Sequence, residues 1–478
     1  MRLKAIFYTF VLTIVSMPLL AQQGPWDLRK CIEYARENNL NLERAEYFLE
    51  DAALVNQRNR LSRLPSLNGQ TSVGAQFGYT IDPTTNTFRS QSIGYNSFSL
   101  NAGMTLYDGG RINHTVKQGE ASLEAARYDV DAAFNDLSLQ IASAYLQILL
   151  GDEQMSAAKK RLNLAQLQLE QTDKLIKAGS LPENDRLDIL AQVALNEQTL
   201  IQAENARASA LLSLRQLLQM DLGQPLEIVR PNVVVPEKAA VETFNATEVY
   251  LAALNTQPQI KADEYRMEAA EEGVGIARSL GIPSLNIFGN MSTNWSSLGS
   301  RLTGEESVVF VPVDVKFPDG TETSLELGQP FPVREDSPYG TQLRDNFGQN
   351  LGVSLNIPIY NASNASISKQ RAEIAVLNAR VTADLNKQLL MSDVQRAVND
   401  VTAAERTYAA AQRSFEAASA SLANAQKRFD LGAINTFELT TAQNNNDQSE
   451  IELIRSKYQY LFNLKILDFY LGRELTID

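Results

Sequence analysis

The chain has 478 residues, with 56 Asp and Glu against 43 Lys and Arg, one His, one Cys and a net charge of −13. At roughly 150 residues per domain, this length allows about three domains or fewer large units. One Cys excludes a disulfide framework or a Cys-based metal site, and one His disfavours His-dependent catalysis. The negative charge argues against a nucleic-acid partner. We therefore expect no enzyme activity and no cofactor.

The N-terminal segment has the pattern of a secretory signal peptide, predicted over residues 1–21. Arg2 and Lys4 precede an apolar run that ends at Leu20, and Ala21 offers a small residue for cleavage. The run is short and interrupted for a helix that spans a bilayer, although an N-terminal anchor is the alternative. No Cys follows Ala21 directly, so we expect an exported protein without a lipid anchor.

The remainder of the chain repeats itself. The segment Leu-Pro-Ser-Leu at 64–67 recurs as Ile-Pro-Ser-Leu at 282–285, an offset of 218 residues. Farther along, 178–180 matches 431–433 at an offset of 253, so the second copy carries an insertion of 35 residues. Prolines mark the junction between the copies. The predicted first repeat, linker and second repeat are 22–223, 224–243 and 244–478.

Each repeat opens with a helical pattern, over 27–61 in the first, and then alternates with a period of two residues. The alternating runs predict one strand hairpin at 66–107 and another at 284–360. One face of each strand is apolar and the other is polar with almost no charge, which is typical of transmembrane β-barrel strands. A half-buried hairpin in a soluble sandwich is the alternative.

Four strands cannot close a barrel, because the smallest barrels have eight. Closure therefore needs two, three or four chains, with eight, twelve or sixteen strands. Aromatic residues near the strand ends are expected at the two lipid–water interfaces. These residues are Tyr79, Tyr95, Tyr107, Trp295 and Tyr360.

The 35-residue insertion falls in the segment 296–345, which is rich in acidic residues. Long loops of outer-membrane barrels lie on the extracellular side. We therefore predict a long external, solvated loop here. No motif in it supports a role as a lid or receptor.

Apolar residues spaced by seven predict long coiled-coil helices in both repeats. They are Ile141, Ile148, Met155, Leu162, Leu169 and Ile176, and in the second repeat Val394, Val401, Tyr408, Phe415, Leu422 and Phe429. A helix that ends near Lys177 would be about 100 Å long at 1.5 Å per residue. So long a helix with a narrow apolar seam must lie beside others in a rod or tube.

The long helices are predicted to end in turns and to reverse. Gly179 and Gly432 suit the left-handed position that follows a helix C-terminus. Ser180 and Asn435 are each followed by a Glu three residues later, which predicts a capping box at the start of each returning helix. Each repeat is thus a strand hairpin and a helical hairpin with a tip near 179 or 432.

With these features the sequence resembles the TolC family of outer-membrane efflux proteins (outer membrane factors) over essentially the whole mature chain. The marks of the resemblance are the junction at 64–67 with its copy at 282–285, the strand ends at Tyr107 and Tyr360, and the two Gly-centred tips. It implies an α+β membrane protein that forms a homotrimer. Four strands from each chain would make a 12-stranded barrel in the outer membrane of a Gram-negative-type bacterium, and antiparallel coiled-coil helices would continue it as a periplasmic tunnel.

The resemblance also implies a passive export duct. Such a duct receives cargo from a periplasmic adaptor protein and an inner-membrane transporter, in a tripartite efflux or type I secretion system. A pump-independent porin or a structural spacer of the envelope is the alternative. The resemblance does not indicate which cargo is carried.

Two groups of site residues are carried over from the family. The expected adaptor-contact residues at the tips are Gly179, Ser180, Leu181, Gly432, Ala433 and Ile434. The expected gate residues, where rings of acids would favour cations, are Asp185, Asp188, Glu438 and Thr441. The alternative is that the first group only makes the turns and that the acids only stabilise helix N-termini.

Overall fold

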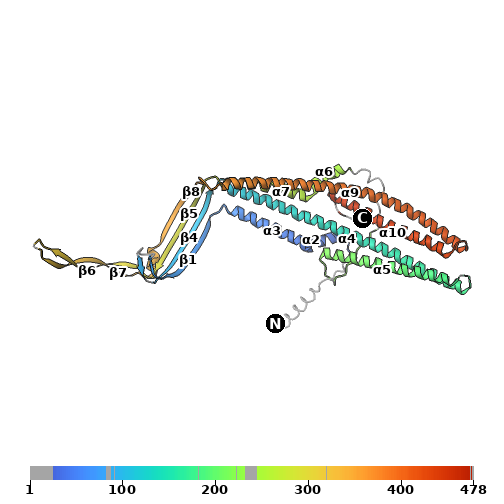
Figure 1. The fold of residues 1–478 in the computed structure, drawn as a ribbon, viewed down its shortest axis with the longest axis horizontal. Helices are drawn as coiled ribbons and strands as arrows, with labels where there is room; N and C mark the ends of the chain where they lie inside the picture. The colour runs from blue at the N-terminus through green and yellow to red at the C-terminus, as the bar shows by residue number, and fades with distance from the viewer. Residues whose placement is uncertain are drawn as a thin grey trace, which may run out of the picture. The chain divides into compact units, whose positions relative to one another are not determined.

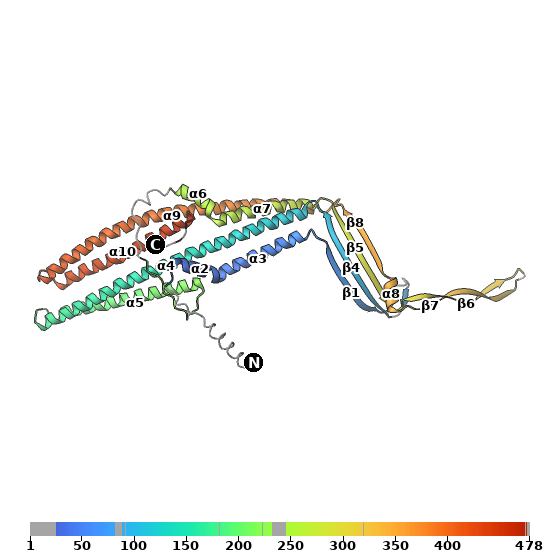
Figure 2. The same cartoon turned by 180° about the vertical axis from the view of Figure 1, so that it is seen from behind.

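The protein is described from a computed structural model, in which residues 25–81, 88–90, 92–180, 182–221, 223–231, 245–318, 320–473 and 475 are placed (Figures 1 and 2). The predicted signal peptide lies outside the described residues. The chain divides into two compact units. The helical unit comprises the described parts of 1–54, 121–268 and 376–478, and the sheet unit those of 55–120 and 269–375.

Long helices of matching length occur in the two halves of the chain. They are α2 (Leu28–Asn38), α3 (Leu40–Leu61), α4 (Arg111–Lys177) and α5 (Asn184–Leu218), and then α6 (Ala246–Thr256), α7 (Pro258–Ser279), α9 (Asn364–Asp430) and α10 (Thr436–Tyr470). Their lengths are 11, 22, 67 and 35 residues in both halves. A duplicated chain would give such a correspondence, and the duplication stays a prediction. No described helix combines the length and apolar character needed to cross a membrane.

The helices of the helical unit pack through the seven-residue seam. Ile141 and Ile148 on α4 are fully buried, as is Val394 on α9. The larger apolar core of this unit joins α2, α4, α5 and α10 around the buried Trp26 and Tyr145. The seam residues recur every two turns, and in the middle of α4 neighbouring residues such as Ala142 and Leu146 are buried beside them.

The predicted helix over 27–61 is wrong in one respect, because the helix is interrupted at Asn39. The Asn39 side chain accepts hydrogen bonds from the backbone N–H groups of Asn41 and Leu42, which caps the start of α3. Its amide nitrogen donates to the carbonyl of Leu217 at the end of α5. An Asn side chain that accepts from the first N–H groups of a new helix stabilises a helix start at that position, in preference to one continuous helix. The segment therefore forms two helices.

The first part of the predicted linker at 224–243 packs against the helical unit. Leu226 is buried in the main core, and Ile228 forms a β-bridge with Trp26. The hydroxyl of Tyr145 donates toward the carbonyls of Trp26 and Val229, which holds these two segments together. The first part of the segment therefore belongs to the helical unit, and residues 232–244 lie outside the described residues.

A four-stranded antiparallel sheet dominates the sheet unit, in the order β1-β4-β5-β8. The strands are β1 (Ser66–Gln76), β4 (Ile93–Tyr107), β5 (Ser284–Ser296) and β8 (Gly348–Asn356), with a small hairpin of β2 (Tyr79–Ile81) and β3 (Phe88–Ser90). Figures 1 and 2 both show the four strands side by side. β1 and β8 are the outer strands of this sheet. The expectation of four sheet strands per chain together with long helices is confirmed.

The segment 296–345, predicted as a long external loop, contains regular secondary structure. This segment forms an antiparallel hairpin of β6 (Ser300–Lys316) and β7 (Glu322–Asp336), followed by the short helix α8 (Tyr339–Asp345). The acidic residues suggested solvent exposure, but residues 307–315 include five valines, a residue type that favours strands. We call the β6–β7 hairpin the ribbon.

Candidate functional site

The four-stranded sheet has one apolar and one polar face, and the strand register makes each face continuous. On the apolar face Leu67 pairs with Ala102, Ala102 with Gly289, and Gly289 with Leu351, so that one row crosses all four strands. None of the strands β1, β4, β5 and β8 contains Asp, Glu, Lys or Arg. A sheet without charge on either face suits one lipid-facing side and one side lining a polar lumen.

An asparagine row crosses the polar face. Asn68 pairs with Asn101, Asn101 with Asn290, and Asn290 with Asn350, so that each of the four strands contributes one. The amide of Asn290 donates to the side-chain oxygen of Asn101 at 2.6 Å. The alternation in the sequence identified these positions as polar, but only the register between strands aligns them.

The interface aromatics lie in different settings. Tyr95 on β4 pairs with Gly74, and its ring occupies the space above that glycine. Trp295 on β5 packs against Tyr339 of α8 with ring centroids 5.6 Å apart. Tyr79 stacks on Phe88 across the β2–β3 hairpin at 5.5 Å.

The prediction that Tyr107 and Tyr360 both end strands is only half right. Tyr107 is the last residue of β4, but β8 ends at Asn356, so Tyr360 lies four residues beyond the strand. Pro358 lies between Asn356 and Tyr360 and has no backbone N–H to donate to a neighbouring strand. Both tyrosines are exposed in the single chain. A role at the membrane interface stays a prediction for all five aromatics.

The two tips have the same backbone geometry. Gly179 and Gly432 have φ angles of +76° and +69°. At the first tip the N–H of Gly179 donates to the carbonyl of Ile176, and that of Ser180 to Leu175. This pair of bonds is the Schellman motif, and the second tip repeats it at Gly432 and Ala433. Ser180, Gly432 and Ala433 are exposed, Ile434 is half-buried, and Leu181 lies outside the described residues.

The two returning helices start differently. Asn435 caps α10, since its side chain accepts from the N–H of Glu438 at 2.9 Å. The predicted capping box at Ser180 is wrong: α5 starts only at Asn184, and Glu183 precedes it without a capping side-chain bond. Pro182 lies between Ser180 and the helix, so the turn is longer than at the second tip.

The predicted gate residues lie in the first turns of the returning helices. Asp185 and Asp188 belong to α5, with Asp185 half-buried and Asp188 exposed. Glu438 and Thr441 belong to α10 and are exposed, and the Thr441 hydroxyl donates to the carbonyl of Phe437. A single chain thus holds the two pairs on separate hairpins.

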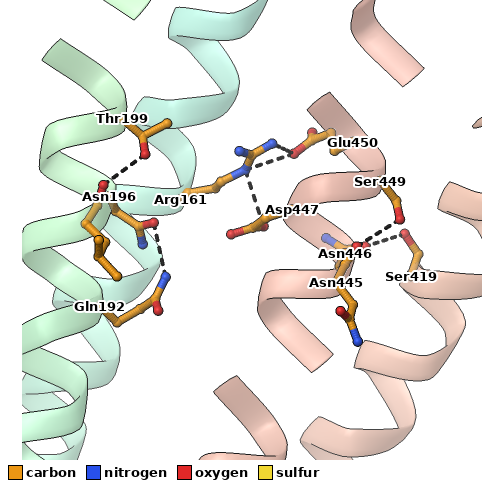
Figure 3. Close-up of polar contacts among 11 residues, drawn as sticks. Arg161, Gln192, Asn196, Thr199, Ser419, Asn445, Asn446, Asp447, Ser449 and Glu450 are labelled. Atoms are coloured by element: carbon orange, nitrogen blue, oxygen red, sulfur yellow. Dashed lines mark hydrogen bonds and ion pairs between the residues drawn. The ribbon is translucent and has the colours of Figure 1, made fainter. Parts of the chain in front are cut away.

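A charged cluster that the sequence did not reveal connects the two hairpins (Figure 3). Arg161 of α4 contacts Asp447 at 3.3 Å and Glu450 at 2.7 Å, both on α10. The Arg161 side chain is only 9% exposed, and those of Asp447 and Glu450 are 24% and 31% exposed. Burial raises the pKa of Asp447 above its usual value, the charge of Glu450 adds to this, and Arg161 opposes it.

Further polar contacts extend the pairing of α4 with α10. Gln443 donates to Gln168 at 3.0 Å, nearer the tips, and Lys457 lies 3.6 Å from Glu153. Together with the Arg161 cluster, these contacts follow an antiparallel path along the two helices. The only signal in the sequence is the seven-residue spacing of Arg161 and Gln168, and it does not identify their partners.

The fold matches that of solved outer-membrane channels. One is a CusC channel, with a TM-score of 0.73, 18% identity and coverage of 95% of this chain and 96% of that chain. Another is the CmeC channel of Campylobacter jejuni, with a TM-score of 0.70, 17% identity and coverage of 93% and 85%. At these identities the comparison supports the fold alone.

Sequence comparison gives the family. Outer membrane protein TolC of Salmonella enteritidis is 25% identical over 254 residues, which is 49% of this chain and 50% of that protein. The chain spans about half to three fifths of the length of the curated relatives it matches. The family described as outer membrane efflux protein matches residues 31–219 and 249–473, nearly all of both halves. The predicted resemblance and the outer-membrane location are confirmed: the chain belongs to the outer membrane efflux protein family.

Proposed function

We propose that the protein is a passive export duct, in which three copies form one barrel in the outer membrane and one helical tunnel in the periplasm. The observation that carries the proposal is the uncharged sheet with one continuous apolar face, joined in the same chain to two helical hairpins. An apolar sheet face supplies a lipid-facing wall, and the polar face with its asparagine row supplies the lining of a water-filled path.

Assembly from several copies follows from the outer strands. A bilayer tolerates strands only in a closed barrel, because unpaired backbone groups cannot be solvated there. The four-stranded sheet ends at β1 and β8. Closure therefore requires β8 of one copy to pair with β1 of the next. Three copies supply twelve strands.

Two helices carry apolar stripes that a single chain leaves exposed. On α3 the stripe repeats every seven residues, and on α9 it follows spacings of three, four and seven. Both are typical of a coiled-coil seam, so we assign these stripes to contacts between copies. The exposed residues are Leu40, Tyr47, Leu54 and Leu61 on α3, and Ile367, Ile374, Leu377, Val381, Leu385 and Leu389 on α9.

The tips are proposed to receive a periplasmic adaptor that belongs to an inner-membrane transporter. Two exposed glycine turns with the same hydrogen-bond pattern, each at the end of a 67-residue helix, provide similar surfaces on the two hairpins. A plain porin has no need for them. In three copies Asp185, Asp188 and Glu438 would place nine carboxylates near the entrance, which favours cations.

The test is a cross-link from the tip in living cells. In a Cys31→Ser background, Ser180→Cys carries a photoactivatable cross-linker, and Ser392→Cys on the exposed surface of α9 is the control. We expect Ser180→Cys, but not Ser392→Cys, to capture a periplasmic adaptor with a helical hairpin, identified by mass spectrometry. Native mass spectrometry of the purified protein should give three copies. A trimer whose tip captures no adaptor would support the porin or spacer instead.

A further inference from the structure

The ribbon has two chemically different faces. In an antiparallel pair, residues directly opposite each other lie on the same face. The register places Val311 opposite Leu327 and Val313 opposite Leu325. We call their face the apolar ribbon face. Its large side chains are Val309, Val311, Val313, Val315, Leu325, Leu327 and Phe331, and no residue on this face from Ser307 to Val315 or from Thr323 to Phe331 is charged.

The other face is charged. The residues that alternate with the apolar ones carry most of the charge. They include the acids Glu306, Asp314, Glu322, Glu326 and Asp336 and the cations Lys316 and Arg334, together with the exposed Val308 and Phe310. Lys316 forms an ion pair with Glu322 at 2.6 Å. We call this the charged ribbon face. With five carboxylates against two cations, copies that turned this face toward one another would repel.

The apolar ribbon face is not covered by its own chain. Leu325, Leu327 and Phe331 are 47–51% exposed, and Val309 and Val313 are 46% and 36% exposed. A two-stranded ribbon in water is marginally stable alone, and an exposed apolar patch normally marks an interaction surface. A ribbon with strands of 17 and 15 residues therefore needs a permanent partner for this face.

Neither lipid nor an added strand suits this ribbon. In a bilayer, the outer backbone groups of a two-stranded ribbon would stay unpaired and its charged face would be buried. Strand addition at an edge needs backbone donors, which Pro312 on β6 and Pro330 and Pro332 on β7 lack. The partner must therefore be a protein surface that packs on the face of the ribbon.

We infer that the ribbons of the copies in one barrel pack together through their apolar faces. This inference rests on the proposed trimer. The ribbon connects β5 to β8, and β8 is the outer strand at which the next copy joins. In a rotationally symmetric trimer, each ribbon has the ribbons of the other two copies as neighbours, with the same apolar face. The uncharged faces meet without repulsion, while the carboxylates of the charged faces remain in water.

Cysteine cross-linking at adjacent positions tests the inference, because neighbouring residues lie on opposite faces. In the Cys31→Ser background, Leu325→Cys and Leu327→Cys probe the apolar ribbon face, and Glu326→Cys between them is the matched control. After oxidation of cells, we expect a disulfide-linked dimer for Leu325→Cys and Leu327→Cys at least tenfold more abundant than for Glu326→Cys. One cysteine per copy can link only two of the three copies.

The oligomer is measured separately by native mass spectrometry of each variant. Trimers in which Glu326→Cys cross-links as well as its neighbours, or in which no position cross-links, would overturn the inference and leave the duct intact. Absence of trimers would instead refute the proposed function. As a second measurement, Leu327→Glu should make the ribbon of intact trimers at least tenfold more sensitive to protease, whereas Glu326→Gln should not. Equal sensitivity of the two variants would also count against the inference.

Discussion

Arg161 on α4 donates two hydrogen bonds to one carboxylate oxygen of Glu450 on α10, at 3.2 and 2.7 Å, across 289 residues of chain. The same guanidinium lies beside Asp447. This contact joins the first helical hairpin to the second, 18 residues before the glycine of the first tip. It is therefore well placed to resist separation of the hairpins.

Replacement of Arg161 should loosen α10 locally. Arg161→Met keeps the apolar stem and leaves two partly buried carboxylates without their cation, which should cost about 2 kcal/mol. Hydrogen exchange of the α10 amides near Asp447 should then be roughly 30-fold faster, since 1.4 kcal/mol corresponds to a factor of ten. The control is Arg186→Met, whose ion pair with Asp173 is 44% and 36% exposed and should contribute little. Equal effects of both variants would contradict the assigned role.

The effect of Arg161→Met should depend on pH through Asp447. Burial raises the pKa of Asp447, so the folded chain holds this proton more tightly than the unfolded chain. Its stabilising contribution is full below the usual Asp pKa and is lost as the pH rises through the raised value. At neutral pH the ionised Asp447 depends on Arg161, and at low pH it does not. The exchange ratio of variant to wild type should fall from pH 7.5 to pH 4, and Asp447→Asn should flatten this change.

Adjacent arginine substitutions should distinguish the two faces of the sheet. Leu100→Arg puts a charge on the proposed lipid face, at a cost of about 2–4 kcal/mol per chain near the bilayer midplane. Asn101→Arg puts the same charge on the proposed lumen face, where water solvates it. The yield of assembled protein in outer membranes should fall strongly for Leu100→Arg and little for Asn101→Arg. The opposite order would mean that the faces are assigned the wrong way round.

Substitution of Gly432 should destabilise the tip because of its left-handed backbone conformation and not because of a steric clash. A Cβ there would meet no atom within 4 Å, so any penalty comes from the φ of +69°. Gly432→Ala should cost about 1 kcal/mol and speed exchange in the last turn of α9, and Gly432→Asn should cost less because Asn tolerates this conformation. Gly340→Ala, in the first turn of α8 and equally open, should be neutral or slightly stabilising. Equal costs for Ala and Asn at 432 would contradict the conformational explanation.

The thiol of Cys31 should be unreactive in the native protein. Cys31 is fully buried, and this burial, with a smaller contribution from Asp27, raises its pKa to about 12. At pH 8 its thiolate should be about a thousandfold scarcer than that of an ordinary cysteine. Maleimide should label the protein only after denaturation, as measured by intact mass. Rapid labelling of the folded protein would show that α2 opens readily.

Much of the architecture could be predicted from the residues themselves. Apolar residues alternating along 97–106 and 285–295 predicted strands, and the seven-residue spacing from Ile141 to Ile176 predicted a long helix. These are periodicities within one segment, and burial on one face imposes them directly. The glycine turns at 179 and 432 were equally local, because a positive φ selects glycine wherever it occurs.

Other features depended on partners far away in the sequence. Asn39 interrupts a helical pattern because it can cap α3 and also reach Leu217. The strands of the ribbon were not predicted, because the acidic residues of the insertion indicated only a solvated loop. The lesson is that acidic composition indicates exposure of one face and does not exclude a strand.

The sequence by itself determined the long helices, the glycine turns and the uncharged character of the sheet strands, because those properties follow from the spacing of residues within each segment. Only the tertiary structure decided which residues meet. The asparagine row needs the register of three strand pairs, and the Arg161 cluster needs α4 and α10 in a particular alignment. Register and alignment are set by the packing of whole elements against one another, and a pattern within one segment contains no information about them.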